Sequence, residues 1–229
     1  MIARTQDRLF AACGIAFVAL ELGGVAIGGK THHLTVASSA TQVARALAKP
    51  ASTVSWVGGY LELLSFGFFL AFAVWASGKL GGGTPGQIAR AAATSYAVLS
   101  VASLAVIDAI AYRAGHGIGV QLGRALVSVN GALYVGSWFL FAFFLIATGA
   151  SAIGSARRRL GWSAIGIALF TLLGTAVSVT GVGQFGILLF FAWIVWASIS
   201  LGRRTRVAAG AAALAWPAAD ITANPRPRP

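Results

Sequence analysis

The clearest guide to the fold is the stretch VSWVGGYLELLSFGFFLAFAVWAS, residues Val54–Ser77. Glu62 is its one charged residue, and aliphatic, aromatic and small side chains make up most of the rest. A helix of about 20 apolar residues is long enough to cross the roughly 30 Å hydrocarbon core of a bilayer. The stretch is therefore predicted to be a transmembrane helix.

Five further apolar stretches of suitable length lie on both sides of this one. They predict an all-α polytopic membrane helix bundle that forms a single domain over residues 1–207, followed by a disordered Pro- and Arg-containing tail at 208–229. The fourth stretch is longer than a span requires, so we expect it to tilt or to project into the cytoplasm. The predicted spans are Leu9–Gly29, Val54–Ser77, Ile88–Tyr112, Leu122–Ile153, Leu160–Gly181 and Phe185–Gly202.

The composition agrees with a membrane protein and argues against other classes. The chain is 58% hydrophobic and 10% charged, whereas a soluble surface needs roughly a quarter charged residues. Its formal net charge of +12 comes from short basic clusters between apolar runs. A nucleic-acid-binding protein gathers its basic residues on one solvated face, so we predict no nucleic-acid partner. Membrane lipids are the expected surroundings.

The basic residues also predict the orientation, because cytoplasmic loops of membrane proteins carry an excess of Lys and Arg. With the N-terminus inside, most of the 17 basic residues fall on the cytoplasmic side. Both termini are therefore predicted to be cytoplasmic, in a multi-pass protein of the cell membrane. The outer side then holds only Lys30, Arg45, Lys49, Arg113 and Arg124.

Two local features concern packing. Thr41–Lys49, in the longest outer connection, places Val43, Ala46 and Leu47 on one helical face, which predicts a short helix lying on the membrane and ending at Pro50. Gly24–Gly28 is a GxxxG pair that favours close helix packing. Since such surfaces serve within or between chains, a homo-oligomer or another membrane partner stays open.

Two motifs lack the surroundings that their chemistry needs. The GxGxxG pattern at Gly181–Gly186 lies between two predicted spans, whereas a dinucleotide site requires a βαβ unit. His32, His33 and His116 fall in predicted outer loops without the i, i+4 spacing that places two metal ligands on one helical face. We predict no cofactor and no metal.

Four polar residues within the spans lie at similar depths. Glu21, Glu62 and Asn130 are each eight residues from the outer end of a span, or about 12 Å at the helical rise of 1.5 Å per residue. Asp108 is four residues from such an end, or about 6 Å. All four are therefore expected in the outer half of the bilayer.

Carboxyl groups at this depth suggest function, because ionisable groups are costly in hydrocarbon and often mark functional sites. We predict Glu62, Asp108 and Glu21 as candidate catalytic acids and bases, since neighbouring carboxyls can divide acid and base roles. Asn130 and Trp138 are candidate ligand-binding residues.

A structural role for the same acids stays open. Glu62 can hydrogen-bond across a helix interface, and Asp108 can pair with Arg113 near the outer boundary.

The chain resembles a known family of membrane proteins in two stretches. The first is the motif Gly59-Tyr-Leu-Glu-Leu-Leu-Ser65, which is followed by an apolar run and Lys79, and the second runs from Gly123 through Arg157–Arg159 into Gly161-Trp162. Both resemble the DUF4386-like family of six-span bacterial membrane proteins. The resemblance is one of layout over residues 9–202. It implies a six-span fold, with Glu62 and Asp108 similar in position to ionisable residues of that family. It implies no particular activity.

Three functions are consistent with these patterns. The first is a pocket that binds a lipophilic small molecule and isomerises or cyclises it by acid–base chemistry, with Glu62 as the principal acid. The second is a component of a proton-coupled transporter, although no internal repeat or broken helix is evident. The third is an accessory membrane subunit without chemistry of its own.

Overall fold

The computed structural model describes residues 2–28, 34, 38–48, 51–114, 116–177 and 182–203, and within these residues it is all-helical. The predicted tail, His32, His33 and Pro50 lie outside the described residues. The long helices match the predicted spans to within a few residues, apart from an N-terminal extension of the first. The helices are α1 Ile2–Gly28, α2 Ala40–Leu47, α3 Thr53–Lys79, α4 Thr84–Arg113, α5 Val120–Gly154, α6 Arg158–Val177 and α7 Val182–Arg203.

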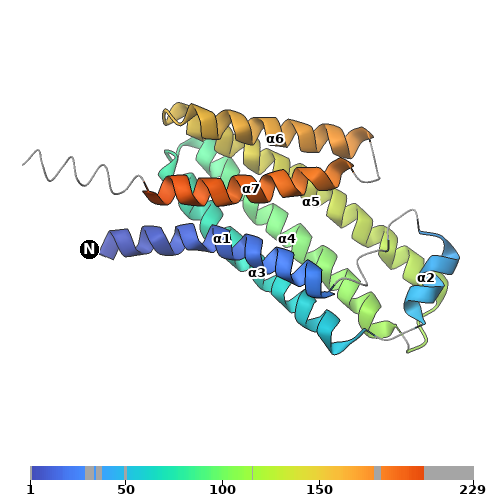
Figure 1. Cartoon of the computed structure of the whole chain (residues 1–229). Coiled ribbons are helices and arrows are strands. Elements are labelled where there is room, and N and C mark those ends of the chain that lie inside the picture. The colour runs from blue at the N-terminus through green and yellow to red at the C-terminus, as the bar shows by residue number, and fades with distance from the viewer. Residues whose placement is uncertain are drawn as a thin grey trace, which may run out of the picture.

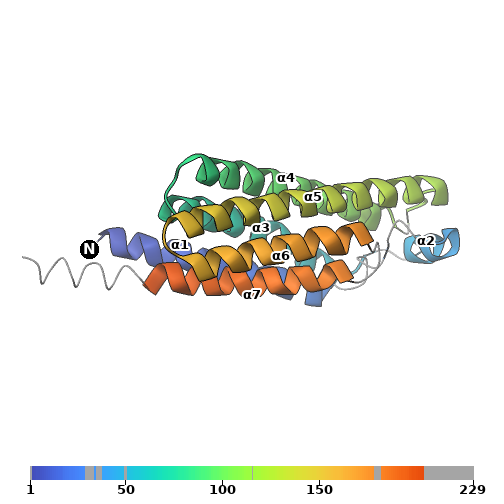
Figure 2. The ribbon, with the colours of Figure 1, turned by 90° about the horizontal axis from the view of Figure 1, so that it is seen from above.

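Within the described residues there are six long helices and the short α2. The long helices run side by side, and α2 lies at one end of the bundle (Figures 1 and 2). The most extensive contacts join α1 to α3 and α4 to α5, while α6 packs against both α5 and α7. The start of α1 and the end of α7 lie at the same end of the bundle, opposite α2 (Figure 1).

Five helices are long and apolar enough to cross a membrane: α1 from Thr5, α3, α4, α5, and α7 from Phe185. The molecule is thus compatible with a multi-pass membrane protein. Over its described residues α6, which begins with Arg158 and Arg159, is not among the five. The last residues of the predicted fifth span lie outside the described part of the chain.

Aromatic rings from five helices form the centre of the core. The ring of Phe190 in α7 lies 4.3 Å from that of Phe141 in α5, measured between centroids, and 6.0 Å from that of Phe17 in α1. It also lies 6.1 Å from Phe69 in α3 and 6.5 Å from Tyr96 in α4. All four of these ring pairs are edge-on, which is a favoured aromatic geometry.

Glycines bring α1 and α3 into backbone contact near their α2-side ends. A Cβ atom on Gly58 would lie 2.5 Å from the Cα of Gly28 and 2.7 Å from the carbonyl oxygen of Gly24. No side chain fits there, so the two backbones are in direct contact at this point. The close packing predicted from Gly24–Gly28 is confirmed, and Gly58 is its counterpart on α3.

The helix α2 forms near the predicted position, but protein covers its apolar face. Val43 and Leu47 are buried and pack around Gly123 of α5, while Ala46 is exposed. The apolar face that was expected to contact the membrane therefore packs on α5 instead, and the position of α2 relative to the membrane stays a prediction. With 35 residues, α5 is about 52 Å long, and its excess length lies at the α2 end (Figure 2).

We predict that Gly58→Ala destabilises the protein and that Gly67→Ala does not. The new methyl group at residue 58 would overlap the backbone of α1, an overpacking that costs about 1–3 kcal/mol. Gly67 lies on the same helix with no atom near its Cβ position, so its replacement should be neutral or stabilise by up to about 1 kcal/mol. Unfolding in detergent measures both, and equal stability of the two variants would contradict the close approach.

Candidate functional site

Glu21 and Glu62 lie at the interface between α1 and α3. The residues Gly58, Glu62, Ser65 and Phe69 recur at helical spacing and are all buried, which places them on one face of α3. Glu62 is only 3% exposed, and a Cβ on Gly24 would lie 2.5 Å from its Cγ. The side chain of Glu62 therefore occupies space that the missing side chain of Gly24 leaves open.

Ser65 links the carboxyl group of Glu21 on α1 to the backbone of α3. Its hydroxyl oxygen lies 2.5 Å from Oε2 of Glu21 and 2.6 Å from the backbone carbonyl oxygen of Glu62. A hydroxyl has one proton to donate, so it cannot serve both acceptors fully. The Ser65 hydroxyl therefore shares its proton between the carboxyl group of Glu21 on α1 and the carbonyl oxygen of Glu62 in its own helix.

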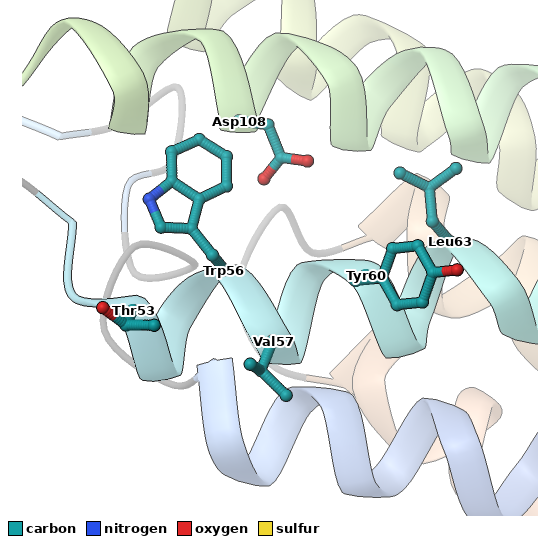
Figure 3. A pocket seen from close by; sticks show the side chains of 6 residues that line it. All are labelled: Thr53, Trp56, Val57, Tyr60, Leu63 and Asp108. Carbon is teal, nitrogen blue, oxygen red and sulfur yellow. The ribbon is translucent and has the colours of Figure 1, made fainter.

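Asp108 reaches α3 on an adjoining face. Its Oδ1 would lie 3.2 Å from a Cβ on Gly59, so this glycine makes room for the carboxyl group. Glu62 follows Gly59 by three residues, so Asp108 approaches α3 about one helical turn away from Glu62. The carboxyl group points from α4 toward α3 (Figure 3).

Asp108 also lines an open pocket of about 430 Å³. Most of its wall comes from the first turns of α3, where the indole of Trp56 lies next to the carboxyl group and Tyr60 lies further along the helix, beside Leu63 (Figure 3). The pocket thus combines one carboxyl group with aromatic and aliphatic walls. The lining residues are Thr53, Trp56, Val57, Tyr60, Leu63 and Asp108.

The other two predicted residues lie on α5. Oδ1 of Asn130 accepts a 2.6 Å hydrogen bond from the hydroxyl of Ser103 in α4. Trp138 is 7% exposed, and its ring lies 5.3 Å, centroid to centroid, from that of Tyr134. Neither Asn130 nor Trp138 lines the pocket around Asp108.

The predicted acids therefore divide between two interfaces. Glu21 and Glu62 lie between α1 and α3, whereas Asp108 lies between α3 and α4 and faces the pocket. No group of three or more His, Cys, Asp or Glu residues that could hold a metal ion occurs within the described residues. The catalytic roles of the three acids stay predictions.

Reasoning from the sequence missed Ser65, Ser103 and Tyr60. Ser65 follows Glu62 by three residues, a spacing that puts both on one helical face, so the signal was present. Ser103 precedes Asp108 by five residues and carries no comparable signal. Tyr60 is 68% exposed and resembles any aromatic residue that faces lipid.

An ion pair joins the start of α1 to the end of α3, at the other end of the interface from Glu21 and Glu62. Nζ of Lys79 lies 2.8 Å from Oδ2 of Asp7, and Nε1 of Trp75 donates a 3.0 Å hydrogen bond to Oδ1 of the same carboxylate. Asp7 is thus a carboxylate with a structural role, at the end of α3 that lies far from the pocket.

We predict that Ser65 and Glu21 are energetically coupled across the α1–α3 interface. A double-mutant cycle with Ser65→Ala and Glu21→Ala should give a coupling of about 1 kcal/mol, typical of a hydrogen bond between membrane helices. Ser77→Ala is the control, because the Ser77 hydroxyl donates to the carbonyl of Ala73 in its own helix. Unfolding in detergent measures the free energies for this cycle and for the control cycle of Ser77→Ala with Glu21→Ala. If the losses of stability caused by Ser65→Ala and Glu21→Ala simply add in the double mutant, the interhelical hydrogen bond does not exist.

Comparisons of the chain with family models, with curated proteins and with solved structures found no match. The resemblance to the DUF4386-like family therefore stays a prediction.

Proposed function

We propose that the chain is a multi-pass protein of the cell membrane with six spans and both termini in the cytoplasm. The exposed side chains of α6 support the sixth span: Trp162, Leu169, Phe170 and Leu173 are all large and apolar, and 38–66% exposed. Such a row is costly in water and favourable in lipid. The arrangement of α6 between α5 and α7 gives an even number of passes, with the ends of α1 and α7 together (Figure 1).

Reporter fusions test this topology. A fluorescent protein that folds only in the cytoplasm should be active when fused after Arg203, and alkaline phosphatase, active only outside, should be inactive there. The same reporters fused after Val177, the last described residue of α6, should give the opposite result because one span fewer precedes them. Phosphatase activity after Arg203 would contradict six spans.

We further propose that the protein binds a lipophilic small molecule in the pocket between α3 and α4. The observation that carries this proposal is the combination of about 430 Å³ of space with one carboxyl group in an otherwise largely apolar wall. Ligand pockets commonly have about 300–1,000 Å³, mostly apolar walls and a few polar groups that orient the ligand. The pocket is open, so a molecule dissolved in the bilayer can reach it laterally.

This proposal assigns different roles to the predicted acids. Asp108 meets the ligand, because it lines the pocket. Glu21 links α1 to α3 through Ser65, and Glu62 packs against Gly24 of α1, so both support the helix that forms the pocket wall. One carboxyl group at the pocket supports binding directly, whereas isomerisation or cyclisation of the ligand stays a prediction.

Filling the pocket tests the binding proposal. We predict that Leu63→Trp lowers the amount of co-purified lipophile at least fivefold relative to wild type, because the indole would occupy the pocket. Leu64→Trp is the matched control: Leu64 is the next residue of α3, is exposed to a similar extent and does not line the pocket. Quantitative mass spectrometry of protein in nanodiscs measures the bound molecule, and size-exclusion chromatography checks folding. Equal amounts in the three proteins would contradict the proposal.

A further inference from the structure

We infer that Arg90, where the end of α3 meets the start of α4, binds the phosphate group of an anionic phospholipid. This site lies at the end of the bundle opposite α2 (Figure 1), so it is separate from the pocket at Asp108. Only its assignment to the cytoplasmic leaflet rests on the proposed topology. The inference follows from the burial of Arg90, from the room beside it and from the charge at this end of the bundle.

The guanidinium group of Arg90 is not fully compensated by the part of the chain that the structure describes. Its Nε atom is buried and has no hydrogen-bond partner within the described residues. Burying a polar group without a partner costs free energy, and the cost is greater when the group is charged. Because nearly all buried polar groups in folded proteins have a partner, the Nε atom of Arg90 indicates that a further, negatively charged group completes this site.

Gly78 of α3 leaves one side of this guanidinium group accessible. A Cβ atom on Gly78 would lie 3.6 Å from Nη2 of Arg90, so a long side chain at residue 78 would cover this nitrogen. Gly78 is exposed and Arg90 is only partly buried, so a ligand can approach the terminal nitrogens from the side of Gly78. The guanidinium charge is delocalised, so an anion at the terminal nitrogens also compensates the charge on the buried Nε.

A phosphate group suits this arrangement. The planar guanidinium group offers parallel N–H donors that match two oxygens of one phosphate, and such charge-assisted pairs are about twice as strong as neutral hydrogen bonds. A zwitterionic headgroup carries a cation beside its phosphate, which the surrounding basic residues would repel. An anionic headgroup has no such cation and is therefore preferred.

The charge at this end of the bundle is strongly positive. Asp7, the described acid nearest to this end, is already bound by Lys79 and Trp75. The other three described acids lie in the half of the bundle nearer α2. Such an excess of basic residues attracts anionic lipid headgroups. The basic residues at the helix ends on this side are Arg8, Lys79, Arg90, Arg157, Arg158, Arg159 and Arg203.

The depth of Arg90 favours a lipid over a soluble anion. Arg90 lies six residues after Thr84, the first residue of α4, or about 9 Å along the helix. Long basic side chains near the ends of transmembrane helices extend to the level of the headgroups. Basic sites between such helices bind the headgroups of anionic lipids. The phosphate that meets Arg90 at this level is therefore that of a lipid, whose acyl chains lie along the bundle.

Two lipids with identical acyl chains test the inference. Dioleoylphosphatidylglycerol is anionic and dioleoylphosphatidylcholine is zwitterionic, and each is titrated into delipidated protein in a nonionic detergent. The rise in Tm with lipid concentration gives an apparent affinity, because a ligand of the native state stabilises it. We expect phosphatidylglycerol to bind about fivefold more tightly than phosphatidylcholine, as one basic contact supplies.

Variants at two positions show whether Arg90 is responsible. Arg90→Gln should abolish the preference for phosphatidylglycerol, whereas Arg203→Gln, which removes an exposed charge at the same end of the bundle, should retain it. Gly78→Leu keeps Arg90 but covers its terminal nitrogens, so it should also abolish the preference and provides a second test if Arg90→Gln fails to fold. Gly67→Leu is its control, because no atom lies near the Cβ position of Gly67. A preference of full size in folded Arg90→Gln or Gly78→Leu would overturn the inference.

Two further measurements separate the alternatives. Inorganic phosphate without lipid should give no stabilisation. If it stabilised the wild type but not Arg90→Gln, and the two lipids bound equally, Arg90 would bind a soluble anion and the lipid assignment would be overturned. Leu63→Trp, which fills the pocket at Asp108 near the other end of α3, should leave the lipid preference unchanged. The failure of the inference is therefore distinguishable from the failure of the proposed function.

Discussion

The candidate site depends on how closely α1 and α3 approach each other. Gly24 and Gly28 on one helix meet Gly58 on the other without any side chain between their backbones. Lipid gives no hydrophobic drive to bring membrane helices together, so close packing and interhelical hydrogen bonds must do so. At this separation the carboxyl group of Glu21 reaches the hydroxyl of Ser65. The glycines thus set the distance at which the polar contacts of α1 and α3 form.

The positions along α3 arrange three kinds of interaction in order. The glycines and acids come first, the aromatic core around Phe69 follows, and Lys79 with Trp75 holds Asp7 at the far end. Phe69 is fully buried and its ring contacts rings of α1, α4, α5 and α7. This aromatic centre lies between the polar contacts of α1 with α3 and the ion pair, so the pocket around Asp108 and the ion pair lie on different parts of α3.

Most of the fold could be predicted because bilayer thickness imposes a length on each apolar run. The observed bounds of α3, Thr53–Lys79, extend the predicted span by one residue at its start and two at its end. The environment of α2 could not be predicted in the same way. Its apolar face suits lipid and protein equally, and only the extra length of α5 around Gly123 decides between them.

The position of each candidate residue along its helix could be predicted from the sequence, but the direction in which its side chain points could not. Counting residues places Glu21, Glu62 and Asp108 in one half of the bundle, and Glu21 and Glu62 do lie close to the same residue, Ser65. The rotation of each helix about its axis depends on packing with its neighbours. Rotation turns Glu62 toward α1 and leaves Asp108 at the pocket, so the residue expected to be the principal acid differs from the one that meets the pocket.

The six continuous helices also bear on the choice between functions. Many transporters bind their substrates at broken helices, whereas α1, α3, α4, α5, α6 and α7 are unbroken over their described residues. A hydrogen bond between Glu21 and Ser65 stabilises the bundle without requiring transport. The pocket beside Asp108 therefore supports a binding function more directly than it supports a proton-coupled one.

A structure of the protein in a lipid nanodisc, determined by electron cryomicroscopy, tests the central claim most directly. Density for a bound molecule between α3 and α4, in contact with Trp56 and the carboxyl group of Asp108, is the result we predict. A second groove, around Leu70 and Val74, provides the comparison, because ordinary lipid is expected there. If the density beside Asp108 were no different from the lipid density in that groove, and the Asp108 carboxyl group pointed away from it, the result would contradict a ligand site between α3 and α4.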